Sequence, residues 1–240
     1  MLIPLGAVVW KSQSGGFANA WDQVTAPQPF AALKMTLAIS ALVALFNLVM
    51  GTLIAWVLVR DDFAGKAVVE FLIDLPFALP TVVAGFVLLS LYGPSTPVHV
   101  NIAFTRLAIA LALLFVTLPF VVRTVEPVMI ELDRDMESAA ASLGARPLLI
   151  ARRIVLPNIV PAMLTGTGLA FARAIGEFGS VSLLSGNLPF HTEVSAVNIY
   201  NQVQSDNTVG AAAQSTVLLM IAFLVLFGLD VLKRRSARRG

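Results

Sequence analysis

Asp74, Arg173 and Glu177 are ionisable residues within stretches that are otherwise apolar. Arg173 and Glu177 stand four residues apart, so on a helix they project from one face and can pair. Ionisable groups inside a membrane are costly and normally mark a bundle interior or a pathway. Two interpretations of the pair stay open: it neutralises itself and holds the bundle, or its helix lines an anion route or outer gate.

Asp74 precedes two closely spaced prolines, Pro76 and Pro80, in the run DLPFALP. A proline lacks an N–H and clashes with the preceding turn, so carbonyls near Leu72 and Pro76 lose their helical donors. Within a membrane such carbonyls are tolerated only against protein or a water-filled path. We therefore predict that Asp74, Pro76 and Pro80 line a pathway or face the bundle.

Small residues recur at every fourth position through the Arg173 segment, at Gly168, Ala172, Gly176 and Ser180. Such small-xxx-small faces let membrane helices pack backbone to backbone. We predict that this face is a helix–helix contact.

Signatures of catalysis and of metal binding are missing from the sequence. It contains no cysteine, and His99 and His191 lie far apart in predicted loops. Gly65-Lys66 is followed by Ala67, so the loop that cradles nucleotide phosphates is absent. We predict no catalytic residue, no metal site and no ATP hydrolysis by this chain.

Residues 131–161 form the longest polar interruption of the chain. Their centre is a run of small residues, Ser138–Ser142, closed by Gly144. Alanine is the best helix former, and a face of Ala and Ser lets another backbone approach closely. Arg146-Pro147 breaks this helix, since a residue before proline is pushed out of the α region. We predict a second helix that ends near Leu156-Pro157. The two short helices would together form a docking element for a partner at the membrane surface.

The composition places the chain among membrane proteins. It is 58% hydrophobic and 12% charged over 240 residues, whereas soluble domains carry about 25% charged residues. Residues 2–10 are apolar but too short to cross, and are either the outer end of a first span or an interfacial segment. With a first span included, we predict about six transmembrane helices, of which the five full spans are 32–59, 67–92, 107–130, 159–184 and 208–232.

The basic residues predict the orientation. Twelve lysines and arginines fall on the side of residues 131–161 and the C-terminus, against three on the other side. The positive-inside rule therefore predicts that this loop and both termini are cytoplasmic. The basic run 233–239 follows a span, so we expect it to meet anionic membrane lipid rather than nucleic acid.

The loop at 131–161 resembles the cytoplasmic "EAA" signature of ABC-importer permeases. Gly144, Ile154 and Leu156-Pro157 have the family's spacing, and Ala139, Ala140 and Gly144 fall on its small positions. The family's glutamate position is Ser138 here, and the nearest acid is Glu137. The resemblance implies that these residues dock in a cleft of a separate ATPase subunit, and that the fold is an all-α type I importer transmembrane domain.

A second stretch, Gly176-Glu177-Phe178-Gly179, resembles the signature of oxyanion permeases. Matches at 74–81, 119–125 and 191–194 point to the T-type subunit of the sulfate/thiosulfate branch. The resemblance covers about residues 30–232. It implies that the four residues belong, with Asp74, Pro76, Pro80 and Arg173, to a translocation path or gate.

Together these features predict a single permease domain over residues 1–240, with its core at 31–232, in the cytoplasmic membrane. The resemblance implies a second, related permease chain, a separate ATPase that carries ATP and Mg²⁺, and an extracytoplasmic sulfate-binding protein. Molybdate or tungstate is the alternative substrate. A secondary anion transporter is the rival class; it would need two symmetry-related broken helices, and the sequence shows one clear break, in the span 67–92.

Overall fold

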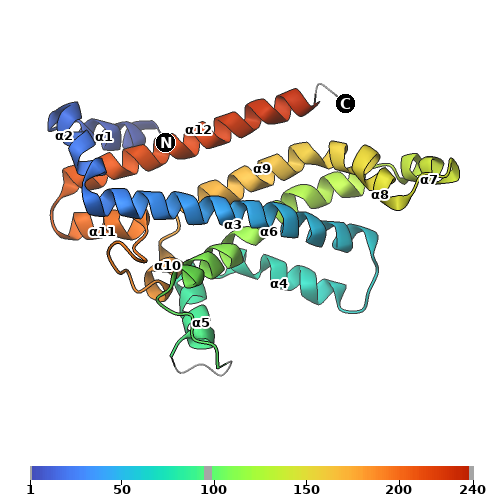
Figure 1. Ribbon diagram of the computed structural model, residues 1–240, viewed down its shortest axis with the longest axis horizontal. Coiled ribbons are helices and arrows are strands. Elements are labelled where there is room, and N and C mark those ends of the chain that lie inside the picture. Colours follow the sequence, from blue (N-terminus) through green and yellow to red (C-terminus); the bar gives the residue numbers. More distant parts are fainter. Residues whose placement is uncertain (1, 95–98, 238–240) are drawn as a thin grey trace.

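The computed structural model describes residues 2–94 and 99–237, which form helices joined by short loops, with no strand in this part of the chain (Figure 1). Within these described residues, four helices are long and apolar enough to cross a membrane. They lie within α3 (Pro27–Arg60), α6 (Arg106–Glu131), Pro147–Ile175, which includes α9 (Leu156–Ile175), and α12 (Thr208–Ala237). A fifth span results if the bent pair α4 (Lys66–Ala78) and α5 (Thr81–Tyr92) is counted as one.

The centre of the bundle is formed by α3, α6 and α9, which pack against one another. One buried cluster joins Ile109 and Leu113 to Val181 and Leu184, and a second joins Val121 and Val125 to neighbouring apolar side chains. Glycine brings the helices close: a Cβ on Gly166 would lie 2.9 Å from Cα of Val121 in α6.

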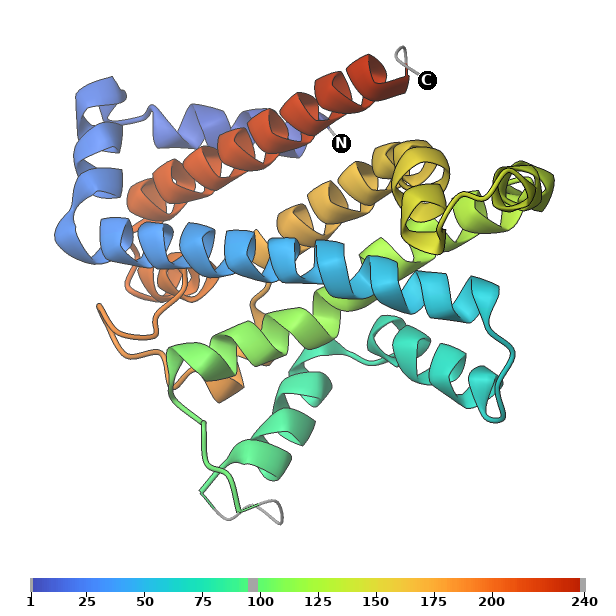
Figure 2. The ribbon, with the colours of Figure 1, turned by 45° about the vertical axis from the view of Figure 1, so that its right-hand side comes forward.

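Short helices cover the two ends of the bundle (Figures 1 and 2). α1 (Leu2–Ser12) lies along α12, and α2 (Gly16–Thr25) and α11 (Ser195–Gln204) lie at one end. α7 (Arg134–Ser142) and α8 (Pro147–Ile150) lie at the opposite end, towards which the C-terminal part of α12 also points. Arg238 and Arg239 of the predicted lipid-contacting run lie outside the described residues.

The predicted span 67–92 is not a straight helix. α4 and α5 are bent by 118° at Leu79–Pro80. Pro80 has no N–H for the preceding turn, and the residue before it, Leu79, is extended at φ −89°, ψ 134°. Pro76 lies inside α4 without ending it.

The predicted span 159–184 was wrong at its C-terminal end, because α9 ends at Ile175 and α10 (Gly179–Leu184) starts after a break. The small residues of this segment therefore do not share one helix face. Gly168 packs against Leu229 of α12, whereas Gly176 is exposed and Ser180 lies buried against α5.

The predicted end of a second loop helix at Leu156-Pro157 was also wrong. α8 continues through a π-helical turn, Ala151–Val155, directly into α9. In this turn the Leu156 N–H bonds five residues back to the Ala151 carbonyl. A π turn shifts the hydrogen-bond register by one residue. Because of this shift, the helix continues through Pro157 although Pro157 has no N–H to donate.

Candidate functional site

The ion pair of Arg173 and Glu177 stands at the break between α9 and α10. Arg173 Nη1 lies 2.5 Å from Glu177 Oε2, and the Glu177 side chain is only 1% exposed. The other carboxylate oxygen, Oε1, accepts hydrogen bonds from the backbone N–H (2.8 Å) and the hydroxyl (2.9 Å) of Ser180. Glu177 thus satisfies a donor in the first turn of α10 and neutralises Arg173 at the same time. Arg173 keeps a third of its side chain exposed.

The two helix breaks lie against each other. A Cβ on Gly179 would stand 2.2 Å from Thr81 Oγ1 and 2.9 Å from the Val82 nitrogen, directly after Pro80. A Cβ on Gly85 would stand 2.7 Å from both Cα and O of Ser180. α5 and α10 therefore touch backbone to backbone, which only glycine at these positions allows. The structure brings Pro80, Glu177 and Gly179 together. Gly176 is exposed in the same break, and the Phe178 ring contacts the Tyr200 ring in a tilted arrangement, with 5.2 Å between the centroids.

Asp74 belongs to a second cluster, between α4 and α6. Arg123 donates from Nε and Nη2 to the two Asp74 oxygens, each at 2.7 Å, and from Nη2 to the Glu70 carbonyl at 3.2 Å. Its Nη1 donates to Glu126 at 2.5 Å. A bidentate arginine–carboxylate pair is directional as well as strong, so Arg123 fixes α4 on α6 at the level of Pro76.

The importance of Arg123 and Gly85 was missed from the sequence. The signal for Arg123 was present, since it lies inside the predicted span 107–130, where a charge needs a partner. Asp74 supplies that partner from the neighbouring span. Gly85 gave no local signal, because only the fold shows which backbone it approaches.

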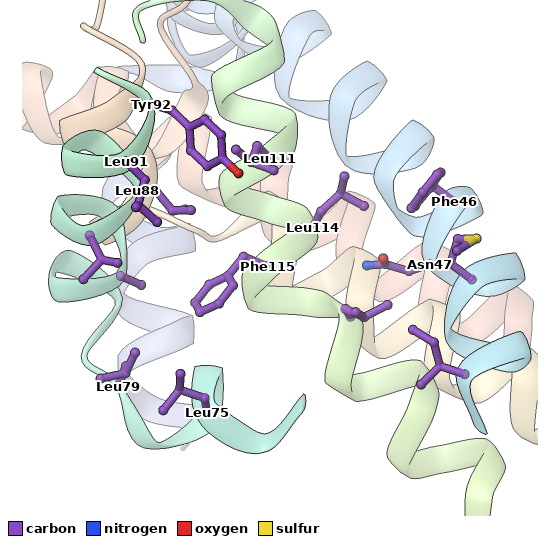
Figure 3. A pocket seen from close by; sticks show the side chains of 15 residues that line it. Phe46, Asn47, Leu75, Leu79, Leu88, Leu91, Tyr92, Leu111, Leu114 and Phe115 are labelled. Carbon is purple, nitrogen blue, oxygen red and sulfur yellow. The ribbon is translucent and has the colours of Figure 1, made fainter. Parts of the chain in front are cut away.

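An apolar cavity of about 450 Å³ opens between α3, α5 and α6, beside the end of α4 (Figure 3). Among its lining residues Asn47 and Tyr92 have a polar nitrogen or oxygen in the side chain. The amide nitrogen of Asn47 donates to Thr117 Oγ1 at 2.8 Å, so it is already used between α3 and α6. An anion that leaves water needs several donors, so this cavity is unsuited to conduct one.

The predicted coupling residues lie at the other end of the bundle, on α7. Glu137 forms an ion pair with Arg60, the last residue of α3, and Arg134 Nη2 donates to the Val59 carbonyl at 3.1 Å. The acid that we expected near a partner thus faces α3. Ser138 and Ala139 are exposed and Ala140 is half-buried.

Gly144 ends α7 in the left-handed region, at φ 84°. Its N–H bonds to the Ala141 carbonyl and the next N–H bonds to Ala140, so carbonyls of the last turn are satisfied. Ile154 lies in the π turn, half-buried, and Leu156 and Pro157 begin α9 with exposed side chains. The predicted coupling residues therefore extend from α7 into the base of a membrane helix.

Large apolar side chains stand exposed on this loop. Met136 is 44% exposed, Leu143 89% and Leu148 80%. α7 itself buries no residue. An apolar surface at the membrane boundary, carried on helices that bury little of themselves, is typical of a docking site for another protein.

Bent spans and an ion pair at a helix break are features that many membrane transport proteins share. Residues 47–239 match the family described as "Binding-protein-dependent transport system inner membrane component". The chain is 41% identical to the sulfate transport system permease protein CysT of Salmonella typhimurium, over 100% of this chain and 89% of that protein. It is 43% identical to CysT of Synechococcus elongatus, over 99% and 88%.

Solved structures show the same fold. A bacterial alginate ABC transporter, in complex with its alginate-bound periplasmic protein, matches with a TM-score of 0.80 at 19% identity, over 98% of this chain and 88% of that one. The MetNI methionine ABC transporter matches at 0.64 and 18%, over 85% and 94%. The chain belongs to the binding-protein-dependent permeases of ABC importers, in the branch of the sulfate permeases CysT, and is a multi-pass membrane protein. The family and fold predicted from the sequence are confirmed.

Proposed function

We propose that this chain is the membrane subunit through which an ATP-driven importer passes sulfate or thiosulfate. The observation that carries the proposal is the identity of about 40% with sulfate permeases over nearly the whole chain. That span includes both helix breaks and the loop of α7 and α8. The residues argued above thus belong to the part that the chain shares with permeases named for sulfate.

The proposal assigns partners to the two ends of the bundle. A separate ATPase, which binds ATP and Mg²⁺, docks on the exposed face of α7 and α8. A binding protein delivers the anion at the opposite end, near α10 and α11. A second, related permease completes the pathway as a heterodimer. The end with α7 and α8 faces the cytoplasm, together with the C-terminus. The described start of the chain does not reach that end, because α1 is only 11 residues long and runs along α12 from the α2 end (Figure 1).

In the proposed mechanism, ATP closes the ATPase pair and moves α7, and the bundle rocks to open the outer end. Arg173 is a cation near that end of the bundle that retains exposed surface. It can donate to a passing oxyanion, because the pair with Glu177 occupies only one side of the guanidinium. At the inner end, Arg123 is paired with two carboxylates. Their negative charges offset the positive potential of the guanidinium, so Arg123 attracts an anion only weakly.

The test uses the chain purified with its ATPase and second permease in proteoliposomes. ATPase activity and anion uptake are measured with binding protein loaded with sulfate, thiosulfate or molybdate, or left empty. We expect stimulation by sulfate or thiosulfate. Stimulation by molybdate alone would contradict the substrate but keep the architecture. Anion uptake that does not depend on ATP would contradict the class and favour a secondary transporter.

A further inference from the structure

α3 is continuous and has no proline beyond its first turn, unlike the pair α4 and α5, α6, and the segment of α8, α9 and α10. It runs through 34 residues, about 50 Å at 1.5 Å per residue, and its prolines lie only in its first turn, where proline is tolerated. α4 and α5 are bent apart, and α9 is preceded by a π turn and interrupted after Ile175. α6 carries Pro119 and Pro127 inside. α3 thus joins the two ends of the bundle without a break (Figures 1 and 2).

The inner end of α3 is tied to α7 by charge. The Arg60 and Glu137 side chains are only 11% and 22% exposed in the ion pair. Arg60 also lies over the Trp56 ring, 5.9 Å from its centroid, which limits the positions that the guanidinium can take. Arg134 adds a bond to the Val59 carbonyl. A shielded ion pair with a fixed arginine holds its geometry better than an exposed one.

The outer end of α3 is tied to the loop before α11. Gln28 donates to Glu193 Oε2 at 2.8 Å, and Asn201 of α11 donates to Glu193 Oε1 at 3.1 Å. The Ser195 backbone N–H donates to Thr36 Oγ1 at 2.8 Å. Glu193 is 2% exposed, so these amides replace the water that its carboxylate has lost.

We propose that Arg60 and Glu137 are positioning residues that make α3 the route by which movement of α7 reaches the outer loop at Glu193. The inference rests on the proposed function. It assigns to Glu137 a bond within the chain, whereas the resemblance counts Glu137 among the residues that dock in the ATPase cleft. Movement of α7 could also reach the bundle along the chain itself, from α8 into α9. That connection contains the π turn, and Pro157 after it has no N–H to donate, so the helix bends more easily there. Contact alone does not establish coupling between sites, so the test must measure it.

The test compares Glu137→Gln, Arg60→Glu and the reversed pair Arg60→Glu/Glu137→Arg in the reconstituted complex. The readouts are complex yield, ATPase activity and anion uptake per ATP hydrolysed. We expect each single variant to lower uptake per ATP about fivefold, the range that coupling residues produce, with yield retained. The reversed pair should regain most of the loss, because the attraction is restored. Asp135→Asn is the matched control, an exposed carboxylate in the same helix.

A second readout does not depend on the anion. The chain has no cysteine, so a cysteine at Leu188, 48% exposed in the outer loop, can be labelled selectively. In the otherwise wild-type chain we expect its labelling rate to change when ATP is trapped on the ATPase, and Glu137→Gln to abolish this change. A change that persists in Glu137→Gln, or a reversed pair as impaired as the single variants, would overturn the inference. Failure of sulfate uptake with an intact ATP-dependent labelling change would contradict only the proposed substrate.

Discussion

At the residue scale, Arg173 and Glu177 are paired, but they share the pair unequally. Glu177 makes three polar contacts and is almost fully buried, whereas Arg173 pairs with Glu177 and stays partly exposed. The pairing follows from the spacing of four and was predictable from sequence. The capping of α10 by Glu177 was not, because it needs the helix break that the sequence did not reveal.

The double substitution Arg173→Gln/Glu177→Gln separates the structural and transport roles of this pair. Removing both charges leaves no buried ion alone, and the amide oxygen introduced by Glu177→Gln can still accept from the Ser180 N–H. We therefore expect complex yield close to wild type. Uptake should fall about tenfold if Arg173 donates to the anion, the loss typical of a hydrogen bond to a charged group. Glu177→Gln alone is the comparison. Normal uptake in the double variant would confine Arg173 to a structural role.

Arg123 offers a second test at this scale. Arg123→Gln leaves the carboxylates of Asp74 and Glu126 without their cation. Because these groups are partly exposed, we expect a loss of about 1–2 kcal/mol in the stability of the purified complex, less than for a fully buried pair. Arg123→Gln/Asp74→Asn should recover part of it. Thermal unfolding in detergent measures the effect, and Lys66→Gln, whose pair with Asp62 is exposed at 3.6 Å, should change little.

At the element scale, the long helices were predictable and their interruptions only partly so. The long apolar stretches predicted the ends of α3, α6 and α12 to within about five residues. Such stretches are reliable because a long apolar segment in a membrane favours helix along its whole length. The break at Pro80 had a local cause in the sequence. The break after Ile175 had none that was decisive, since glycines also occur within membrane helices. It depends on Glu177 bonding to Ser180 and on α5 lying against α10.

Gly85 tests that contact between α5 and α10. In Gly85→Ala the new Cβ would meet the Ser180 backbone at 2.7 Å, so the two helices must separate. Overpacking of this kind costs about 1–3 kcal/mol, and we expect a lower melting temperature and reduced uptake. Gly228→Ala in α12 is the control: its Cβ meets nothing within 4 Å, and alanine favours helix over glycine by about 1 kcal/mol. Equal effects of the two substitutions would contradict the close contact.

Gly144 tests why α7 ends as it does. Leucine or alanine there must adopt φ 84°, at a cost of about 1–2 kcal/mol for an L residue with a Cβ, whereas asparagine tolerates this region. We expect Gly144→Leu and Gly144→Ala to uncouple the ATPase from uptake, and Gly144→Asn to remain close to wild type. The sequence suggested close approach by a partner as the reason for this glycine. If close approach by a partner were the reason, asparagine would be as harmful as leucine. ATPase activity and anion uptake of the Gly144→Asn and Gly144→Leu variants distinguish the backbone explanation from the close-approach explanation.

At the scale of the whole molecule, two ends of different chemistry oppose each other across the apolar bundle. One end has buried polar side chains around Glu193, and the other has the exposed side chains of α7 and α8. In the ribbon, α11 and α7 lie at opposite ends (Figure 1). Since lysine and arginine are concentrated on the α7 side, the positive-inside rule predicts that this side faces the cytoplasm. The same rule predicts that the loop before α11 lies outside, where the proposed binding protein would approach.

Single cysteines in this cysteine-free chain test the orientation directly. Leu143→Cys is on α7's C-cap, where the native side chain is 89% exposed, and Leu188→Cys is in the outer loop at 48%. A membrane-impermeant maleimide applied to intact spheroplasts should label Leu188→Cys and spare Leu143→Cys, and permeabilisation should make both reactive. The positive-inside preference acts through short loops near span ends, and residues 131–161 are such a loop. Labelling of Leu143→Cys before permeabilisation would invert the orientation, and the exposed surface of α7 and α8 would then face the binding protein instead of an ATPase.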